Sequence, residues 1–192
     1  MPKVVPEYKA QARARIVTAA RAVFRRKGFR GATMEDIANE IEVSKGALYL
    51  YFRTKAELLG EIQSEARGEV LHLWEQLLDS GDVAEGMAKS LDQVFSGEVD
   101  PAIFHELVAE SASDPEVRNA ILQDRRDDSK MMRGFLRELE ARGRIPKMKD
   151  PATVAEIVLK LFEGTVLQVM LEGSQSSARR SLVRELKFVL GC

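Results

Sequence analysis

The stretch from Thr33 to Lys55 reads T-M-E-D-I-A-N-E-I-E-V-S-K-G-A-L-Y-L-Y-F-R-T-K. It predicts two short helices, because Thr33 and Ser44 are residues that cap helix N-termini well. Apolar residues at spacings of three and four give each predicted helix one buried face; they are Ile37, Ala38, Ile41, Leu48, Tyr51 and Phe52. Only Glu42 and Val43 separate the two helices, so these must cross steeply with Val43 filling the gap. The pattern is that of a helix-turn-helix, whose second helix enters the major groove of DNA.

The outward side of the second predicted helix carries small residues and hydrogen-bonding side chains. Gly46 and Ala47 occupy its first turn, where a helix exposed only to water would rarely place them. Two ordinary crossed helices of an all-α core are the alternative. We prefer the DNA-binding interpretation, because the turn, both caps and this outward face would otherwise have to coincide by chance.

At these residues the chain resembles a known family. The run V-S-K-G-A-L-Y-L-Y-F-R-T-K-A-E-L-L resembles the signature of TetR-type transcriptional regulators, and A-A-R-A-V-F-R-R-K-G-F-R-G-A-T resembles their first helix and loop. The strong resemblance covers about Arg13 to Leu59; beyond it, only length, helicity and a few local patterns match. One departure is Glu42, where the family usually has Gly. A left-handed turn at Glu42 should cost about 1 kcal/mol.

The candidate DNA contacts lie on and beside the second helix. They are Thr33, Ser44, Lys45, Gly46, Ala47, Tyr49, Tyr51 and Lys55. Lys45 can donate to guanine acceptors, while Ala47 and Tyr49 can touch thymine methyl groups. The resemblance implies that the Thr, Tyr and Lys at positions 33, 51 and 55 contact phosphates. A solvated lysine is the alternative for Lys55, and core packing for Tyr51.

Charge divides the chain into a basic and an acidic part. Residues 1–55 hold 12 Lys+Arg and 5 Asp+Glu, a net charge of +7; the rest therefore holds 29−12=17 and 30−5=25, a net charge of −8. A basic head joined to an acidic body is typical of a phosphate-binding domain attached to one that meets no phosphate. We therefore expect a helix-turn-helix DNA-binding domain at 1–55 and a ligand-binding and dimerisation domain at 56–192.

The remaining chain reads as helices only. A first helix should span about Lys9 to Lys27. Its apolar residues at helical spacing should face inward and its arginines outward; the inward residues are Ile16, Ala19, Ala20, Val23 and Phe24, and the outward ones are Arg13, Arg15, Arg21, Arg25 and Arg26. A capping box at 54–57 should open a long helix to about Asp79, and a shorter helix should span 83–96. Asp-Pro pairs at 100–101, 114–115 and 150–151 predict three further helix starts, and Ser176 or Ser177 should cap the last helix. No strand alternation or internal repeat is present. The expected fold is all-α, with about nine helices.

The helix at 152–171 is apolar nearly all round and therefore needs partners on two faces. With the last helix it can form a four-helix bundle between two subunits. A two-fold homodimer also suits a palindromic double-stranded DNA operator. A larger internal core is the alternative explanation of the apolar surplus.

Helices of the second domain are expected to enclose a pocket for a largely apolar effector, whose identity the sequence does not reveal. The candidate lining residues are Trp74, Met87, Leu91, Phe95, Phe104, His105, Val108, Met131, Phe135 and Phe162. Methionine and phenylalanine suit an adaptable apolar site. Each residue singly is better explained as ordinary core, and His105 as a capped or surface histidine.

Several function classes lack support in the sequence. There is no Gly-rich phosphate loop and no nucleophile elbow, and His105-Glu106 lacks the second His of a zinc protease motif, so we expect neither catalysis, nor a metal, nor a cofactor. A single cysteine and no 18-residue apolar run favour a cytoplasmic protein without a membrane partner. Two hypotheses remain: a ligand-released repressor, or a DNA-binding adaptor or architectural protein without a small effector.

Overall fold

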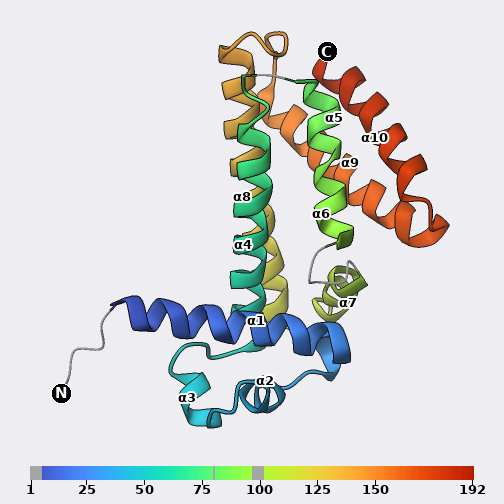
Figure 1. Ribbon diagram of the computed structural model, residues 1–192. Coiled ribbons are helices and arrows are strands. Elements are labelled where there is room, and N and C mark those ends of the chain that lie inside the picture. Colours follow the sequence, from blue (N-terminus) through green and yellow to red (C-terminus); the bar gives the residue numbers. More distant parts are fainter. Residues whose placement is uncertain (1–5, 80, 97–101) are drawn as a thin grey trace. The chain divides into compact units, whose positions relative to one another are not determined.

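The computed structural model describes residues 6–79, 81–96 and 102–192, which are mostly helical and contain no strand. The helices are α1 (Pro6–Gly31), α2 (Met34–Glu40), α3 (Lys45–Tyr49), α4 (Lys55–Glu75), α5 (Val83–Ala88), α6 (Ser90–Ser96), α7 (Ala102–Glu110), α8 (Pro115–Ala141), α9 (Pro151–Glu172) and α10 (Gln175–Leu190) (Figure 1). Lys89 between α5 and α6 keeps helical backbone angles, so this pair covers the single helix expected at 83–96. The all-α fold is confirmed.

The chain forms two compact units. Unit 1 contains the described residues of Met1–Glu65 and Glu98–Leu122, and unit 2 those of Ala66–Gly97 and Gln123–Cys192. The first half of α4 belongs to unit 1, and so does α7, because Ile103 and Leu107 are buried in the same core as α1.

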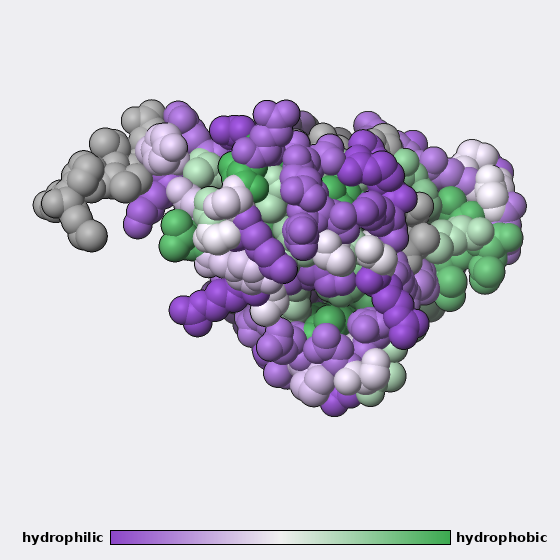
Figure 2. Space-filling view, turned by 90° about the horizontal axis from the view of Figure 1, so that it is seen from below, coloured by the Kyte–Doolittle hydropathy of each residue, from purple (hydrophilic) through white to green (hydrophobic). Residues whose placement is uncertain are grey.

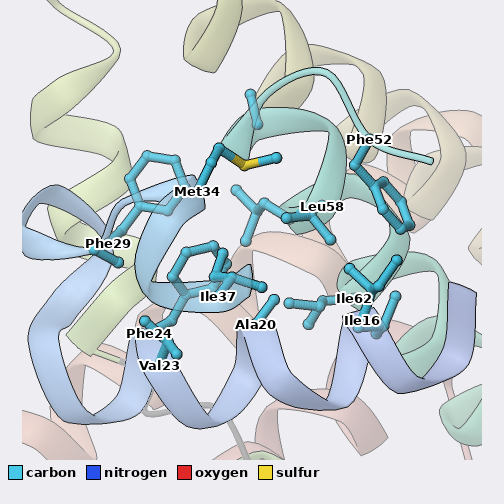
Figure 3. Close-up of a cluster of buried hydrophobic side chains, with 14 of the residues drawn as sticks. Ile16, Ala20, Val23, Phe24, Phe29, Met34, Ile37, Phe52, Leu58 and Ile62 are labelled. Carbon is cyan, nitrogen blue, oxygen red and sulfur yellow. The ribbon is translucent and has the colours of Figure 1, made fainter. Parts of the chain in front are cut away.

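The core of unit 1 joins α1 to the helix-turn-helix. The predicted inward stripe of α1 is buried throughout: Ile16, Ala19, Ala20, Val23 and Phe24. Figure 3 shows four of them, Ile16, Ala20, Val23 and Phe24, in one cluster with Ile37 of α2, Phe52, and Leu58 and Ile62 of α4. The helix-turn-helix is therefore held on one side by a continuous apolar core.

Unit 2 is built around a second core. Its members come from α4, α5, α6, α8, α9 and α10 and include Trp74, Met87, Leu91, Met132, Leu136 and Leu186. α9 and α10 pack against each other over much of their length (Figure 1). α10 is also tied to α5, since Lys187 Nζ lies 2.7 Å from Asp82 Oδ2.

The cap predictions had mixed outcomes. Asp114 Oδ1 accepts from the amides of Glu116 and Val117, and Asp150 Oδ1 from those of Ala152 and Thr153, so both residues cap their helices. The pair at 100–101 lies outside the described residues. The cap at Ser176 or Ser177 is wrong, because α10 already starts at Gln175, after Ser174, whose side chain makes no cap bond. Gly173 ends α9 in a left-handed conformation, and α10 begins two residues later, at Gln175.

No helix among the described residues is long and apolar enough to cross a membrane. No group of three or more His, Cys, Asp or Glu side chains in the same residues could hold a metal ion.

Candidate nucleic-acid interface

The first helix of the motif, α2, begins with a reciprocal cap. The Asp36 amide donates to Thr33 Oγ1 at 3.1 Å, and the Thr33 amide donates to Asp36 Oδ2 at 3.0 Å. Hydrogen bonds from Lys27 Nζ, at 2.6 Å, and from Thr33 hold the pKa of Asp36 down to about 2. The two hydrogen bonds of this cap thus fix Thr33 at the N-terminus of α2, where its side chain is exposed.

The turn between α2 and α3 depends on one unusual backbone conformation. Glu42 has φ 56°, and it is the one non-glycine residue with positive φ in the described part of the chain. The Val43 amide then donates to the Ala38 carbonyl at 3.0 Å, and Val43 packs on the core of unit 1. The left-handed turn expected from the family comparison is therefore present despite the missing glycine.

The second helix, α3, is capped by Ser44, whose Oγ accepts from the Ala47 amide at 3.1 Å. Leu48 and Phe52 are fully buried, as expected for the inward side. Among the predicted contacts, Thr33, Ser44, Lys45, Gly46 and Tyr49 are exposed, whereas Ala47, Tyr51 and Lys55 are half-buried. Of the three residues predicted to read bases, the structure thus leaves Lys45 and Tyr49 accessible on α3 and Ala47 half-buried.

Leu50, which ends α3, is a further candidate contact that is not among the residues predicted from the sequence. It is 83% exposed, more than Tyr49 beside it. A signal was available, because Leu48, Tyr51 and Phe52 point inward and leave Leu50 on the opposite side of the turn. Leu50 extends the accessible surface of α3 with an apolar side chain suited to a thymine methyl group.

Arg13 of α1, expected to face outward, instead braces the motif. Its guanidinium donates to the Tyr51 carbonyl at 3.2 Å and to Glu61 Oε2 at 2.6 Å, and it lies 4.3 Å from the centroid of the Phe52 ring. Such contacts hold the end of α3 between α1 and α4. No local pattern could have revealed them, since the partners lie 38 and 48 residues away.

Lys55, the candidate phosphate contact, also has a partner within unit 1. Its Nζ donates to the Phe29 carbonyl at 2.7 Å and lies 4.6 Å from the centroid of the Phe29 ring. Burial lowers the pKa of Lys55, although Glu110, Glu106 and Asp114 oppose this effect. A phosphate contact from Lys55 stays a prediction.

Figure 2 views the molecule from the side of α2 and α3. This face is largely hydrophilic, with hydrophobic residues showing between the polar ones. Such a surface suits a partner that is itself polar and charged.

The candidate effector residues separate into two groups. Trp74, Met87, Leu91, Phe95, Met131, Phe135 and Phe162 meet in the core of unit 2. The ring of Trp74 is tilted against those of Phe135 and Phe162, with its centroid 5.2 Å and 5.9 Å from theirs. His105 and Val108 lie on α7 in unit 1, where Val108 is 47% exposed. Phe104 is also on α7, and its side chain lies outside the described part.

The described residues of unit 2 include a pair of surface grooves of similar size. One, of about 510 Å³, lies between α4 and α8 and is lined by Leu71, Glu75, Leu78, Asp127, Lys130, Met131, Gly134, Phe135 and Glu138. The other, of about 570 Å³, is more polar and lies between the α5–α6 pair and α10. Met131 and Phe135 connect the first groove to the predicted effector residues.

Comparison with known families agrees with this architecture. Residues 16–62 match the model of bacterial regulatory proteins of the tetR family, and residues 78–188 match that of the tetracyclin repressor-like C-terminal domain. The chain belongs to the TetR family. It is a helix-turn-helix regulator of transcription and not an enzyme.

Individual relatives of this TetR-family chain are distant but similar in length. The transcriptional regulator YfiR of Bacillus subtilis is 28% identical over 198 residues, covering 98% of this chain and 95% of that protein. UidR of Escherichia coli is 24% identical and covers 93% and 88%. Among solved structures, Salmonella enterica GusR has a TM-score of 0.76 at 22% identity, covering 100% of both chains. Reduced E. coli NemR also has a TM-score of 0.76, at 18% identity over 94% and 98%.

Proposed function

We propose that this TetR-family protein is a cytoplasmic repressor that binds a palindromic operator as a homodimer and is released by a largely apolar small molecule. The observation that carries the proposal is the accessible face of α3, where Lys45, Gly46 and Tyr49 are exposed on a motif capped at both helices. The net charge of +7 on residues 1–55 supports phosphate binding.

Dimerisation is supported by apolar side chains left exposed on the last two helices. They are Ile157, Leu167, Met170 and Leu171 of α9 and Phe188 of α10, the last 89% exposed. The opposite side of α10 packs into the core of unit 2, where Leu182, Leu186 and Leu190 are buried. A second copy placing its own α9 and α10 here would cover these residues and form a four-helix bundle.

The dimer can be tested by light scattering on the full chain. Phe188→Glu together with Leu167→Glu should yield a monomer, because two carboxylates would be buried without partners. Leu122→Glu, a change at an exposed apolar residue of α8 in unit 1, should leave the dimer intact. An unchanged dimer in the double variant would place the interface elsewhere.

The groove between α4 and α8 is the best-supported effector site, since its wall is mainly apolar and it runs beside the aromatic cluster of Trp74. A solved relative described as the multidrug binding protein EbrR was crystallised with imidazole, and one from Saccharomonospora viridis with choline. Each of these two proteins thus holds a small molecule, which supports the proposal of an effector for this chain. An effector acts only if it binds the DNA-incompetent state more tightly; a tenfold preference corresponds to about 1.4 kcal/mol.

The effector proposal can be tested by filling the groove. A Cβ on Gly134 would meet nothing within 4 Å, so Gly134→Phe should fold, fill the groove and abolish release from DNA by an effector found in a compound screen. Gly134→Ala is the matched control and should respond normally. Equal responses of the two variants would move the effector site elsewhere.

The alternative function is a DNA-binding adaptor or architectural protein without a small effector. Mass spectrometry of the protein purified without denaturation would detect a retained ligand. If none is retained and no compound weakens operator binding, the adaptor function becomes the better one.

A further inference from the structure

Glu106 of α7 binds the backbone at the end of α1. The Phe29 amide donates to Glu106 Oε2 at 2.8 Å, and the Arg30 amide donates to Glu106 Oε1 at 2.6 Å. Gly28, with φ 70° and ψ 168°, interrupts the helical backbone just before these amides. Both oxygens of one carboxylate are thus committed to two successive amides, an arrangement typical of a bound anion.

The same segment is held from a second side by α4. Lys55 Nζ donates to the carbonyl of Phe29, whose amide bonds to Glu106. The Phe29 side chain is buried and packs on Phe24 with ring centroids 5.3 Å apart. Three helices, α1, α4 and α7, therefore meet at one residue.

A side chain at position 28 would crowd the carboxylate of Glu106. A Cβ there would lie 3.0 Å from Glu106 Oε2 and 3.3 Å from Oε1, and φ 70° is itself unfavourable for a side chain. α7 is seated on the same core, since Ile103 and Leu107 are buried in it. The carboxylate of Glu106 is thus placed by packing as well as by its two hydrogen bonds.

The backbone at Phe29 and Arg30 forms the corner between α1 and α2, and the DNA-reading motif follows it directly in the chain. Only Gly31 and Ala32 separate Arg30 from Thr33, which caps α2. A change in the backbone at 29–30 would therefore alter the start of α2 and, through the short turn, the direction of α3.

We propose that Glu106 is a positioning residue for DNA recognition. It holds the corner between α1 and α2 in the geometry in which α3 fits the major groove of DNA. The inference rests on the DNA-binding part of the proposed function and needs neither the dimer nor the effector. This inference gives α7 a role in DNA recognition, although α7 follows the helix-turn-helix by some 50 residues.

Charge and positioning predict opposite effects for Glu106→Gln. Removing a negative charge from a DNA-binding unit should strengthen binding if only the overall field matters. Glutamine offers one acceptor and presents an NH₂ group to the second amide, so the corner should loosen and binding should weaken.

The experiment measures the affinity of the full-length protein for a duplex that the wild type selects from random DNA. Glu106→Gln should bind about tenfold more weakly at constant salt. The matched control is Glu110→Gln, the same charge change one turn along α7. Glu110 Oε2 lies 3.5 Å from the Arg30 side chain and is not among the backbone acceptors at this corner, so its loss should change affinity by less than about twofold.

Two further measurements separate positioning from folding. Glu106→Asp keeps the charge but shortens the reach; it should also weaken binding, and it decides the matter if Glu106→Gln does not fold. Amide hydrogen exchange at Phe29 and Arg30 should accelerate in both Glu106 variants and not in Glu110→Gln. Faster exchange with unchanged DNA affinity would make Glu106 a structural cap only and overturn the proposal.

The remaining outcomes are also decisive. Equal losses in Glu106→Gln and Glu110→Gln, or tighter binding by folded Glu106→Gln, would overturn the positioning role. A wild-type protein that selects no duplex would overturn the operator-binding proposal and this inference with it.

Discussion

Glu42 carries the clearest local strain in the described chain. Its φ of 56° lies in the left-handed region, where a β-carbon is unfavourable and glycine is not. Its side chain is exposed, so a substitution removes little packing.

Glu42→Gly should therefore raise the free energy of unfolding by about 0.5–1 kcal/mol. Glu42→Ala keeps the β-carbon and should stay near the wild-type value. Chemical denaturation monitored by circular dichroism measures both changes. If Gly and Ala behave alike, the conformation of the turn is not the source of the strain.

Asp124 of α8 carries a charge that folding disfavours. Burial, then the nearby negative charge of Asp128, raise its pKa to about 7, although Arg67 NH1 lies 2.6 Å from Asp124 Oδ1 and 2.8 Å from Asp128 Oδ1. The guanidinium of Arg67 thus pairs with two carboxylates. The pKa of Asp128 is raised as well, mainly by burial.

This shift predicts how stability depends on pH. In the unfolded chain Asp124 ionises near pH 4, and in the folded protein near pH 7, so the folded state holds the proton more tightly between these values. The free energy of unfolding should fall as pH rises from about 4 to 7 and then level off.

Asp124→Asn should flatten that slope. The variant should gain roughly 1–2 kcal/mol relative to the wild type between pH 5 and pH 8. Glu116→Gln, an exposed change on the same helix, should keep the wild-type slope. Urea titrations at several pH values provide the comparison, and parallel curves for Asp124→Asn and the wild type would refute the assignment.

At the scale of the element, α3 divides into a base-reading side and flanking supports. Tyr49 is exposed beside Leu50, whereas Lys55 lies beyond α3, bonded to Phe29. A side chain in the groove can discriminate bases, while a phosphate contact or a support for the fold acts on all sequences alike.

Tyr49→Ala should therefore change the consensus selected from random DNA as well as weaken binding, whereas Lys55→Ala should weaken binding to all sequences without changing the consensus. Sequencing of selected duplexes measures both. A shifted consensus for Lys55→Ala together with an unchanged one for Tyr49→Ala would reverse the two roles.

At the scale of the whole molecule, the separation of charge should govern affinity. The +7 on residues 1–55 is concentrated in the part that contains the helix-turn-helix, and the −8 lies in the remainder. DNA binding through phosphates releases counterions, so affinity falls steeply with salt.

Affinity for the selected duplex should drop by roughly 10³-fold between 50 and 200 mM salt if about six phosphates are neutralised by the dimer. Fluorescence anisotropy across this range measures the slope. A nearly constant affinity would contradict a binding mode based on phosphate contacts.

The sequence by itself determined the features that depend on residues a few positions apart. The caps at Thr33 and Ser44, the inward stripe of α1, the left-handed turn at Glu42 and the start of α9 after Asp150 were all predictable. Each is decided by backbone geometry and by apolar spacing within one or two helical turns. The all-α fold follows from the same local signals.

Only the tertiary structure decided which distant groups meet. Glu106 reaches amides 76 and 77 residues before it, and Arg13 reaches Tyr51 and Glu61. The tertiary structure also placed α7 in unit 1, in the same core as α1. A single glutamate in a helix shows no local mark of its partner, because its hydrogen bonds depend on how whole helices pack and not on the spacing of neighbours along the chain.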